Sequence, residues 1–292
     1  MSKYNNQWVY AWLLLLPAMI LLLGFTHIPA IETFIDSFFS TGRGRRSSEF
    51  VGFENYQRLI GDEVFLRVLW NNSIYAAITI PASIGLAIAM ALFVHTPRRG
   101  VGLLRMAYFT PTVLPLIAVA NIWIFFYLPT IGLIDQIRAL FGFQAQNWIG
   151  QPDTVLYTMI AVAVWKEAGF FMIFYLAALQ AIPQPLREAA ALEGAGRWTF
   201  FKRVTLPLIM PTTLFVSVNA VINAFRLVDH IFVMTQGGPN NASNLLLYYI
   251  YDVAFAFWDT AYASTLTVVL LAILSLMAIG QFFLFDRKVH YK

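Results

Sequence analysis

Three polar residues share one face of an otherwise apolar segment. Asn219, Asn223 and Arg226 follow one another at spacings of four and three residues, which places them on one side of an α-helix. Their amide and guanidinium groups could hydrogen-bond the hydroxyl groups of a solute that approaches from that side. Because Arg226 is about one turn from Asp229 and His230, a structural ion pair is the competing interpretation.

Other polar and aromatic residues also lie within apolar segments, where polar groups are costly and often functional. Lys166 and Glu167 could simply pair, or extend their side chains towards lipid headgroups. Trp123 and Trp165 could stack on a sugar ring, although aromatic residues make up 16% of the chain and most must serve packing. With Glu167 beside them, the candidate residues of a solute path are Asn121, Trp165, Lys166, Asn219, Asn223 and Arg226.

The sequence contains no motif for ATP hydrolysis. A phosphate-binding loop ends in Lys followed by Ser or Thr, and none of the five lysines is followed by either. The four histidines are scattered and there is no cysteine, so neither metal nor thiol chemistry has a visible constellation. We therefore expect no catalytic residue, cofactor or metal on this chain, and we expect any energy source to be a partner.

The segment 181–211 is predicted to form a short helix-turn-helix. Strong helix formers fill Leu186 to Glu193, Gly194 permits a bend, and Arg197 to Val204 can form a second helix. The segment also carries large apolar side chains, namely Leu192, Trp198, Phe200, Phe201 and Val204. It is therefore either a knob that enters a cleft in a partner or an amphipathic loop that rests on lipid headgroups.

The composition is that of a membrane protein. Of 292 residues, 59% are hydrophobic and 12% are charged, whereas soluble domains average about 45–50% and about 25%. A bilayer core of about 30 Å needs roughly 20 apolar residues per helix. Six stretches qualify: about Val9 to Ile28, Val68 to Val94, Leu103 to Leu128, Val155 to Ile182, Leu206 to Met234 and Ala261 to Phe285. Pro81, Pro111, Pro115 and Pro211 lie in or near these spans and predict kinked helices around a cavity.

The first stretch lacks the small-x-small cleavage site of a signal peptide, so we interpret it as a retained helix. With both termini in the cytoplasm, the inner loops carry eleven basic and three acidic residues, and the outer loops carry six basic and ten acidic residues. This distribution obeys the positive-inside rule. The exception is the cluster Arg43, Arg45 and Arg46, which lies in a long outer loop where charge has less influence on topology.

Two outer segments are long. Residues 29–67 are polar and glycine-containing, so we expect an extracytoplasmic cap or loop there. In residues 129–153, the apolar spacing of Ile131 to Phe141 predicts an amphipathic helix at the membrane interface, with Trp148 as an interfacial anchor.

The segment 181–211 resembles the signature of the inner-membrane permease subunits of binding-protein-dependent ABC importers. That signature reads Glu-Ala-Ala, three residues, Gly, nine residues, Ile, one residue and Leu-Pro, and here Val204 replaces Ile while Glu193 stands where many members carry Asp. The resemblance implies that this helix docks in a cleft of a separate ATPase subunit. The implied docking residues are Glu188, Ala189, Ala190, Glu193, Gly194, Arg197, Leu206 and Pro207.

The resemblance covers essentially the whole chain and is strongest to the carbohydrate and glycerol-phosphate branch, that is, to maltose-type and glycerol-phosphate first permeases. Val51 to Tyr56, Trp70 to Ser73 and Tyr248 to Phe255 are similar to segments of that branch. Gly237, Gly238 and Pro239 are also typical of it, and the resemblance implies that they contact the binding protein.

The implied fold is an all-α integral membrane protein with six transmembrane helices, the type I ABC importer permease fold with a cytoplasmic coupling helix. Residues 1–67 would form the first helix and outer loop, 68–285 the transmembrane core with the coupling loop 183–207, and 286–292 a cytoplasmic tail. The protein would lie in a bacterial inner membrane with both termini cytoplasmic.

By the same resemblance, the chain would form half of the path for a sugar, glycoside or glycerol-phosphate-type solute, by alternating access. Its partners would be a second, different permease, two ATPase subunits that hold ATP and Mg²⁺, an extracytoplasmic solute-binding protein and membrane lipid, without nucleic acid. A secondary ion-coupled carrier and a non-transport membrane enzyme or scaffold are the alternatives. The residues do not distinguish a neutral from an anionic solute.

Overall fold

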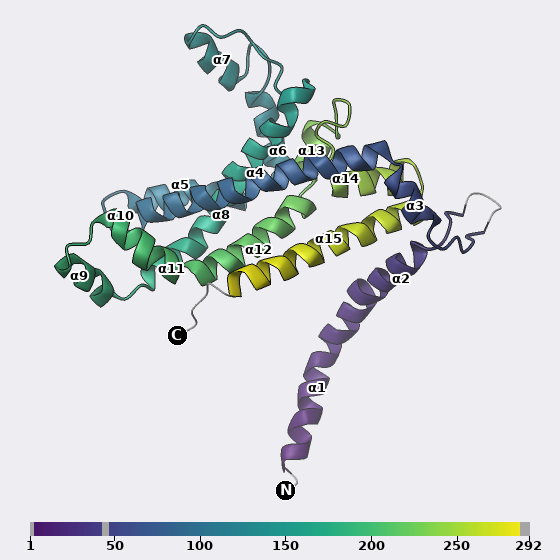
Figure 1. The fold of residues 1–292 in the computed structure, drawn as a ribbon, viewed down its shortest axis with the longest axis horizontal. Coiled ribbons are helices and arrows are strands. Elements are labelled where there is room, and N and C mark those ends of the chain that lie inside the picture. Colours follow the sequence, from purple (N-terminus) through teal and green to yellow (C-terminus); the bar gives the residue numbers. More distant parts are fainter. Residues whose placement is uncertain (1–2, 43–46, 287–292) are drawn as a thin grey trace. The chain divides into compact units, whose positions relative to one another are not determined.

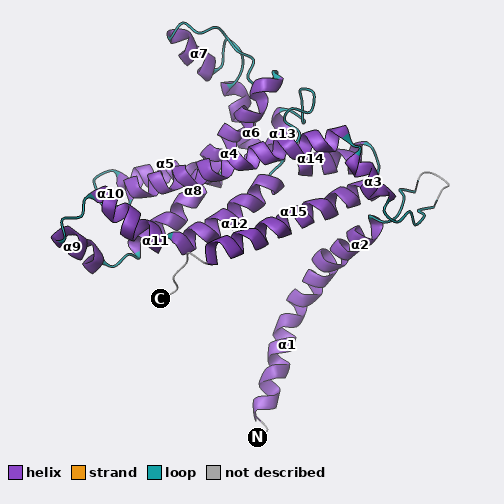
Figure 2. Cartoon of the chain, in the orientation of Figure 1, coloured by secondary structure: helices purple, strands orange, loops and turns teal. Residues whose placement is uncertain are grey.

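The computed structural model describes residues 3–42 and 47–286 (Figure 1). The regular elements of these residues are helices, and the remaining pairing is an isolated antiparallel bridge between Phe39 and Phe50 (Figure 2). The chain forms two compact units, of which the first comprises residues up to Asp62 together with Ile250–Leu271. The second comprises Glu63–Tyr249 and the residues from Ala272 onwards. The domain boundaries expected from the sequence remain predictions.

The first unit begins with one long helical span. The helix α1 (Lys3–Leu22) continues through a π-helical turn, η1 (Leu23–His27), into α2 (Ile28–Asp36). From Trp8 to Asp36 none of the side chains is buried within the chain, so this apolar surface must be covered by lipid or by another subunit. The span is longer than the predicted Val9 to Ile28, because Pro29 lies in the first turn of α2, where a proline is tolerated.

The second unit contains most of the helices. They are α4 (Glu63–Val94), α5 (Val101–Val113), α6 (Leu116–Phe126), α7 (Leu133–Leu140), α8 (Pro152–Gln180), α9 (Gln184–Leu192), α10 (Arg197–Phe200), η2 (Phe201–Thr205), α11 (Leu206–Leu208), α12 (Met210–Arg226) and α13 (Asp229–Met234). In the first unit, α3 (Glu54–Ile60) follows the bridge. The helix α14 (Leu246–Tyr251), the turn η3 (Asp252–Ala256) and the helix α15 (Thr260–Asp286) complete the described elements.

The core of the second unit lies where α4, α8 and α12 pack side by side (Figure 1). Ala87 and Ala91 of α4 and Ala220 of α12 are fully buried there, beside the larger Phe171 and Tyr175 of α8. Small residues on two of three helices let the backbones approach closely, which is the usual way in which membrane helices pack.

Among the described residues, five helical segments are long and apolar enough to cross a membrane, or six if the pair α5 and α6 counts as one span. The sequence predicted a continuous span from Leu103 to Leu128, but α5 and α6 meet at an angle of 103°. The cause is local, because Pro115 cannot continue the helical hydrogen bonds and forces Leu114 into an extended conformation with ψ of 136°. The third predicted span is therefore sharply broken rather than kinked.

Other boundaries also differ from the prediction. The second span begins at Glu63 rather than Val68, and the fifth begins at Met210 because the residues before it form η2 and α11. The outer segment after the first span begins after Asp36 rather than at Pro29. The cytoplasmic placement of both termini remains a prediction, and the cluster Arg43, Arg45 and Arg46 lies outside the described residues.

The predicted amphipathic helix before Phe141 is confirmed as α7 (Leu133–Leu140). Trp148, predicted to be an interfacial anchor, donates its indole N–H to Asp135 at 3.0 Å. The Asp135 carboxylate also accepts the backbone N–H groups of Thr130 and Gln146. Trp148 therefore has a structural partner within its own segment, and its contact with the membrane interface remains a prediction.

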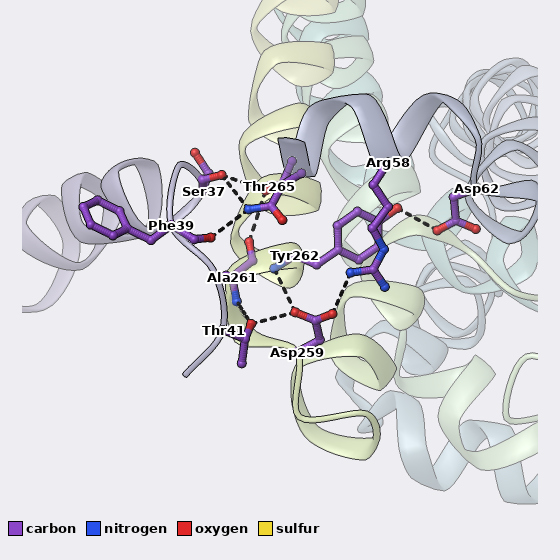
Figure 3. A network of polar contacts seen from close by, with 10 residues as sticks. Ser37, Phe39, Thr41, Arg58, Asp62, Asp259, Ala261, Tyr262 and Thr265 are labelled. Atoms are coloured by element: carbon purple, nitrogen blue, oxygen red, sulfur yellow. Dashed lines mark hydrogen bonds and ion pairs between the residues drawn. The ribbon is translucent and has the colours of Figure 1, made fainter. Parts of the chain in front are cut away.

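In the first unit, the Asp259 carboxylate ties the outer loop to the start of α15 (Figure 3). It accepts a hydrogen bond from the Thr41 hydroxyl at 2.6 Å and pairs with the Arg58 guanidinium at 2.7 Å. Arg58 also lies over the Tyr262 ring, 3.9 Å from its centroid, and the Tyr262 hydroxyl donates to Asp62 at 2.6 Å. One carboxylate thus holds loop residues to a transmembrane helix.

Asn55 also holds the outer loop, through two backbone carbonyl groups. Its amide donates to the carbonyl oxygens of Ser37 and Phe39, at 3.0 and 2.8 Å. Thr265 of α15 donates to the Ser37 carbonyl as well, at 3.2 Å. The segment Val51 to Tyr56, noted in the sequence as a family-like pattern, therefore folds the outer loop through Asn55.

We predict that Asp259→Asn loosens the outer loop. Burial alone would raise the pKa of Asp259, but hydrogen bonds from Thr41 and Arg58, the charge of Arg58 and the Tyr262 N–H outweigh it and lower the pKa. A carboxyl of lowered pKa stabilises the fold above its unfolded-state pKa, and this contribution is lost as the pH falls through the folded-state pKa. Since Arg58 is half exposed, the ion pair contributes less than about 1 kcal/mol, and we expect a total loss of about 1–2 kcal/mol.

Protease susceptibility of the outer loop in intact membranes measures this effect. Asp259→Asn should be cut faster than the parent at neutral pH and should show less additional cutting at acidic pH. Glu49→Gln, which changes an exposed carboxyl of the same loop, is the matched control and should behave as the parent does. Equal cutting of all three proteins would show that Asp259 does not hold the loop.

Candidate docking loop and solute path

The helices α9 and α10 form a knob whose tip is exposed within the described part of the chain. Along α9 no residue is buried, and the side chains of Leu192 and Trp198 are 91% and 73% exposed. Glu188 accepts a hydrogen bond from Gln184 at 2.8 Å within the same helix. Trp198 stacks on Phe201, with ring centroids 5.5 Å apart. The predicted helix-turn-helix is confirmed, with Leu192 and Trp198 exposed and the apolar residues Phe200, Phe201 and Val204 half-buried.

Gly194 forms the turn between the two short helices. It has a φ of +71°, and the Ala195 N–H bonds to the Ala190 carbonyl at 2.9 Å while the Gly194 N–H bonds to the Ala191 carbonyl at 3.1 Å. These two bonds are the Schellman pattern that ends a helix at a glycine. No atom lies within 4 Å of a Cβ placed on Gly194, so the left-handed backbone, not lack of space, is the reason for glycine.

The predicted docking residues divide into two groups. Glu188, Ala189, Glu193 and Arg197 are exposed on α9, its C-terminal end and the start of α10, and Ala190 is half-buried. Leu206, in contrast, packs against the buried cluster of α4, α8 and α12, next to the buried Thr205 and Ile209. Pro207 is exposed at the start of α11. The first part of the motif thus faces outwards, whereas Leu206 attaches the loop to the core.

Lys166 does not pair with Glu167, although the two are adjacent on α8. Its ammonium group donates to the carbonyl oxygens of Pro111 at 2.9 Å and Leu114 at 2.6 Å, at the break between α5 and α6. Glu167 is buried, with 6% exposure, and its carboxyl interacts with the Asn223 side chain of α12. Its Oε2 atom has no hydrogen-bond partner in the described part of the chain. The sequence did not predict the partners of either side chain.

The other amide candidates bond to their own helices. Asn121 donates to the Ile117 carbonyl at 2.9 Å, and Asn219 donates to the Phe215 carbonyl at 2.8 Å. Asn121 and Arg226, at the end of α12, are exposed on apolar helices, and Asn219 is half-buried. An exposed polar group is costly where it faces lipid. The helix faces that carry these side chains are therefore expected to line a polar solute path or to pack against another subunit.

The ion pair considered for Arg226 is absent from the described residues, and that alternative is wrong. The helix α12 ends at Arg226, Leu227 is extended, and Asp229 begins the new helix α13, so the one-turn geometry is lost. His230 is buried and its Nε2 atom lies 3.2 Å from the Tyr75 hydroxyl of α4. Arg226 is therefore left without a carboxylate partner in the described part of the chain.

Trp123 and Trp165 contact each other rather than standing apart. Their rings meet edge to face, with centroids 5.5 Å apart. Trp123 also stacks on Tyr127 at 5.4 Å. Trp165 is still 40% exposed, so it retains a surface that another molecule could contact.

The Gly237-Gly238-Pro239 segment belongs to a loop that two asparagines of α4 hold in place. Asn71 donates to the carbonyl oxygens of Asn241 and Asn244, at 2.7 and 3.1 Å. The side-chain Oδ1 of Asn72 accepts a hydrogen bond from the Leu246 N–H at 3.1 Å. Asparagine can donate and accept at once, which suits it to anchoring a loop backbone. The Trp70 to Ser73 segment and this loop therefore form one structural feature.

Gly237 itself is buried and has a φ of +78°, and a Cβ at this position would lie 3.2 Å from the side chains of Asn244 and Tyr248. It shapes the loop, and its predicted contact with a binding protein remains a prediction. Gln236 and Asn240, which flank the three residues, are the exposed positions. A contact of this loop with another protein would therefore use its flanking residues together with Gly238 and Pro239, which are half-buried.

Comparison with known proteins gives the class of the protein. Residues 83–291 match the family described as binding-protein-dependent transport system inner membrane component. The chain belongs to this family. It is thus a multi-pass inner-membrane permease subunit of an ABC importer, and the resemblance seen in the segment 181–211 is confirmed.

Similar permeases match along nearly their whole length. The probable ABC transporter permease protein YurN of Bacillus subtilis is 31% identical over 95% of this chain and 96% of its own. The sulfoquinovosyl glycerol permease protein SmoG of Agrobacterium fabrum is 32% identical over 89% and 85%. The sn-glycerol-3-phosphate permease protein UgpA of Yersinia pseudotuberculosis is 32% identical over 99% and 98%.

The fold also matches a solved structure. A chain of a bacterial ABC transporter that imports the acidic polysaccharide alginate superimposes with a TM-score of 0.86, covers 98% of both chains and is 23% identical. This likeness confirms the all-helical importer permease fold of the present permease.

We predict that the conformation of Gly194 is required for the knob. Gly194→Val should cost about 1–2 kcal/mol or more in the turn, because a β-branched residue is poorly tolerated at positive φ. Asparagine adopts this conformation more readily, so Gly194→Asn is the matched control. Limited proteolysis at residues 184–204 in membranes measures the turn, and the valine variant should be cut much faster. Equal behaviour of the two variants would contradict the assignment.

Proposed function

We propose that this permease forms half of the translocation path of an ATP-driven importer for a carbohydrate or glycerol-derived solute, with α9 docked in a partner ATPase. The single observation that carries the docking is the exposure of Leu192 and Trp198 on a knob with a defined turn. Large apolar side chains on a short polar loop favour a protein partner that buries them.

The proposed complex has two different permeases, two ATPase subunits that bind ATP and Mg²⁺, and an extracytoplasmic solute-binding protein. The chain's own lysines lack the setting of a phosphate-binding loop, which supports placing ATP on a partner. The excess of basic residues in the loops that contain α9 and α10 supports a cytoplasmic location for the knob and for both termini.

The solute path is proposed to run along the face of α12 that carries Asn219, Asn223 and Arg226. These side chains are exposed or half-buried at membrane depth, and Asn223 lies beside the buried Glu167. An amide can donate hydrogen bonds to a solute hydroxyl and accept them from another, and a carboxylate can accept hydrogen bonds from several hydroxyl groups. The names of the similar permeases, which include sulfoquinovosyl glycerol, sn-glycerol-3-phosphate and lactose transport, support a polyhydroxylated solute.

Co-purification tests the docking. A tagged permease extracted from its native membrane should carry an ATPase with a phosphate-binding loop and a second permease. Leu192→Glu places a charge on the exposed apolar tip of the knob, so it should abolish recovery of the ATPase while the second permease is retained.

Leu140→Glu is the matched control, because Leu140 is likewise an exposed leucine, 83% accessible, at the end of a short helix. It should leave the recovery of the ATPase unchanged. If Leu192→Glu also retained the ATPase, the knob would be a loop that rests on lipid, and the docking proposal would fail.

Uptake measurements test the solute path. Asn223→Ala removes a neutral hydrogen bond, which contributes about 0.5–1.5 kcal/mol, so the half-saturating solute concentration should rise by roughly 2–10-fold. Ser73→Ala is the control, because the Ser73 hydroxyl bonds to the Leu69 carbonyl of its own helix outside the proposed path. An unchanged half-saturating concentration and maximal rate in Asn223→Ala would count against this path.

A further inference from the structure

The break between α5 and α6 leaves two backbone carbonyl groups without helical donors. Pro111 would normally bond to the N–H of residue 115, but Pro115 has none. Leu114 is extended, so its carbonyl leaves the helical pattern. Both groups lie in a span-like apolar segment, where water is not available to replace the missing donors.

Lys166 supplies donors to these two carbonyl groups. Its Nζ atom lies 2.9 Å from the Pro111 oxygen and 2.6 Å from the Leu114 oxygen. An ammonium group has three donors, and a positive charge at the C-terminal end of a helix is favourable. Arg105 acts in the same way elsewhere, since it donates to the Val94 carbonyl at the end of α4 at 3.1 and 2.7 Å.

The neighbours of Lys166 on α8 contact both arms of the break. On the α5 side, a Cβ at Gly169 would collide with the Tyr108 carbonyl, so the two backbones touch. On the α6 side, Trp165 packs against Trp123, with ring centroids 5.5 Å apart. A short stretch of α8 therefore holds α5 through Gly169 and Lys166, and holds α6 through Trp165.

We infer that Lys166 is a positioning residue that sets the angle between α5 and α6 and makes both arms follow α8, rather than a residue that contacts the solute. The helix α8 ends at Gln180 and α9 begins at Gln184, so a movement of α9 would reach the break through α8. This last step rests on the proposed docking of α9. Two of the three N–H donors of Lys166 are directed at backbone carbonyl groups and not towards a solute.

Distance measurements test the angle directly. The chain contains no cysteine, so spin labels can be attached to Leu103→Cys on α5 and Phe125→Cys on α6, which are 67% and 60% exposed. In the full chain, in lipid nanodiscs with its co-purifying partners, native Lys166 should give one narrow distance distribution. Lys166→Met should broaden or displace it, and Lys166→Arg, which keeps the donors, should restore it. An unchanged distribution in Lys166→Met would overturn the inference.

A second test compares the loss of thermal stability on Lys166→Met in two backgrounds, and it can be made even if this variant accumulates poorly. Pro115→Ala provides an N–H group for the Pro111 carbonyl, so the loss of Lys166 should matter less in that background. The melting temperature of the detergent-solubilised complex should therefore fall much less on Lys166→Met when residue 115 is alanine, because the two sites share one carbonyl. Equal losses in both backgrounds would overturn the inference.

Uptake separates a positioning role from solute contact. Lys166→Met should lower the maximal rate at least tenfold and leave the half-saturating solute concentration unchanged, and Lys166→Arg should recover the rate. A raised half-saturating concentration with an unchanged maximal rate would assign Lys166 to the solute and overturn the inference. If the native complex takes up no solute, the proposed function fails, whereas the distance and stability measurements still decide the role of Lys166.

Discussion

Backbone carbonyl groups without donors at membrane depth are the constraint on which this structure depends. A helix in lipid satisfies its own backbone, and any interruption must be satisfied by a side chain from elsewhere. In the permease the helical hydrogen bonds are interrupted at the break between α5 and α6, and the Lys166 ammonium group donates hydrogen bonds to two of the freed carbonyl groups. Because an ammonium group from α8 is needed there, the broken helix and α8 form one mechanical element.

Asparagine side chains perform the corresponding task in the loops. Asn55 binds two carbonyl groups of the outer loop in the first unit, and Asn71 binds two carbonyl groups of the loop after α13 in the second. An amide can satisfy irregular backbone without carrying a charge. The family-like segments around Asn55 and Asn71 are thus explained by loop folding, and the exposed positions beside them remain for contacts with other proteins.

The knob formed by α9 and α10 differs from these loops, because no residue of α9 is buried. The helices α9 and α10 bury little of their own surface, and the left-handed turn at Gly194 defines their mutual orientation. Leu206, at the end of the same motif, is packed into the core cluster. Under the proposed docking of α9, a movement of a partner would pass from the exposed tip to α8 and α12 through the packed Leu206.

The sequence by itself determined the membrane class, the approximate spans, the helix-turn-helix before the fifth span and the family. These depend on long apolar runs and on residues at fixed short spacings, which one chain displays directly. Only the tertiary structure showed which groups Lys166 and Glu167 contact, and that Arg226 has no carboxylate partner among the described residues. Lys166 bonds to carbonyl groups 55 and 52 residues away in the sequence, and helical periodicity reports only the neighbours on a residue's own helix. Pro115 breaks the helix locally, but the side chain that supplies donors to the freed carbonyl groups comes from another helix, which no local pattern records.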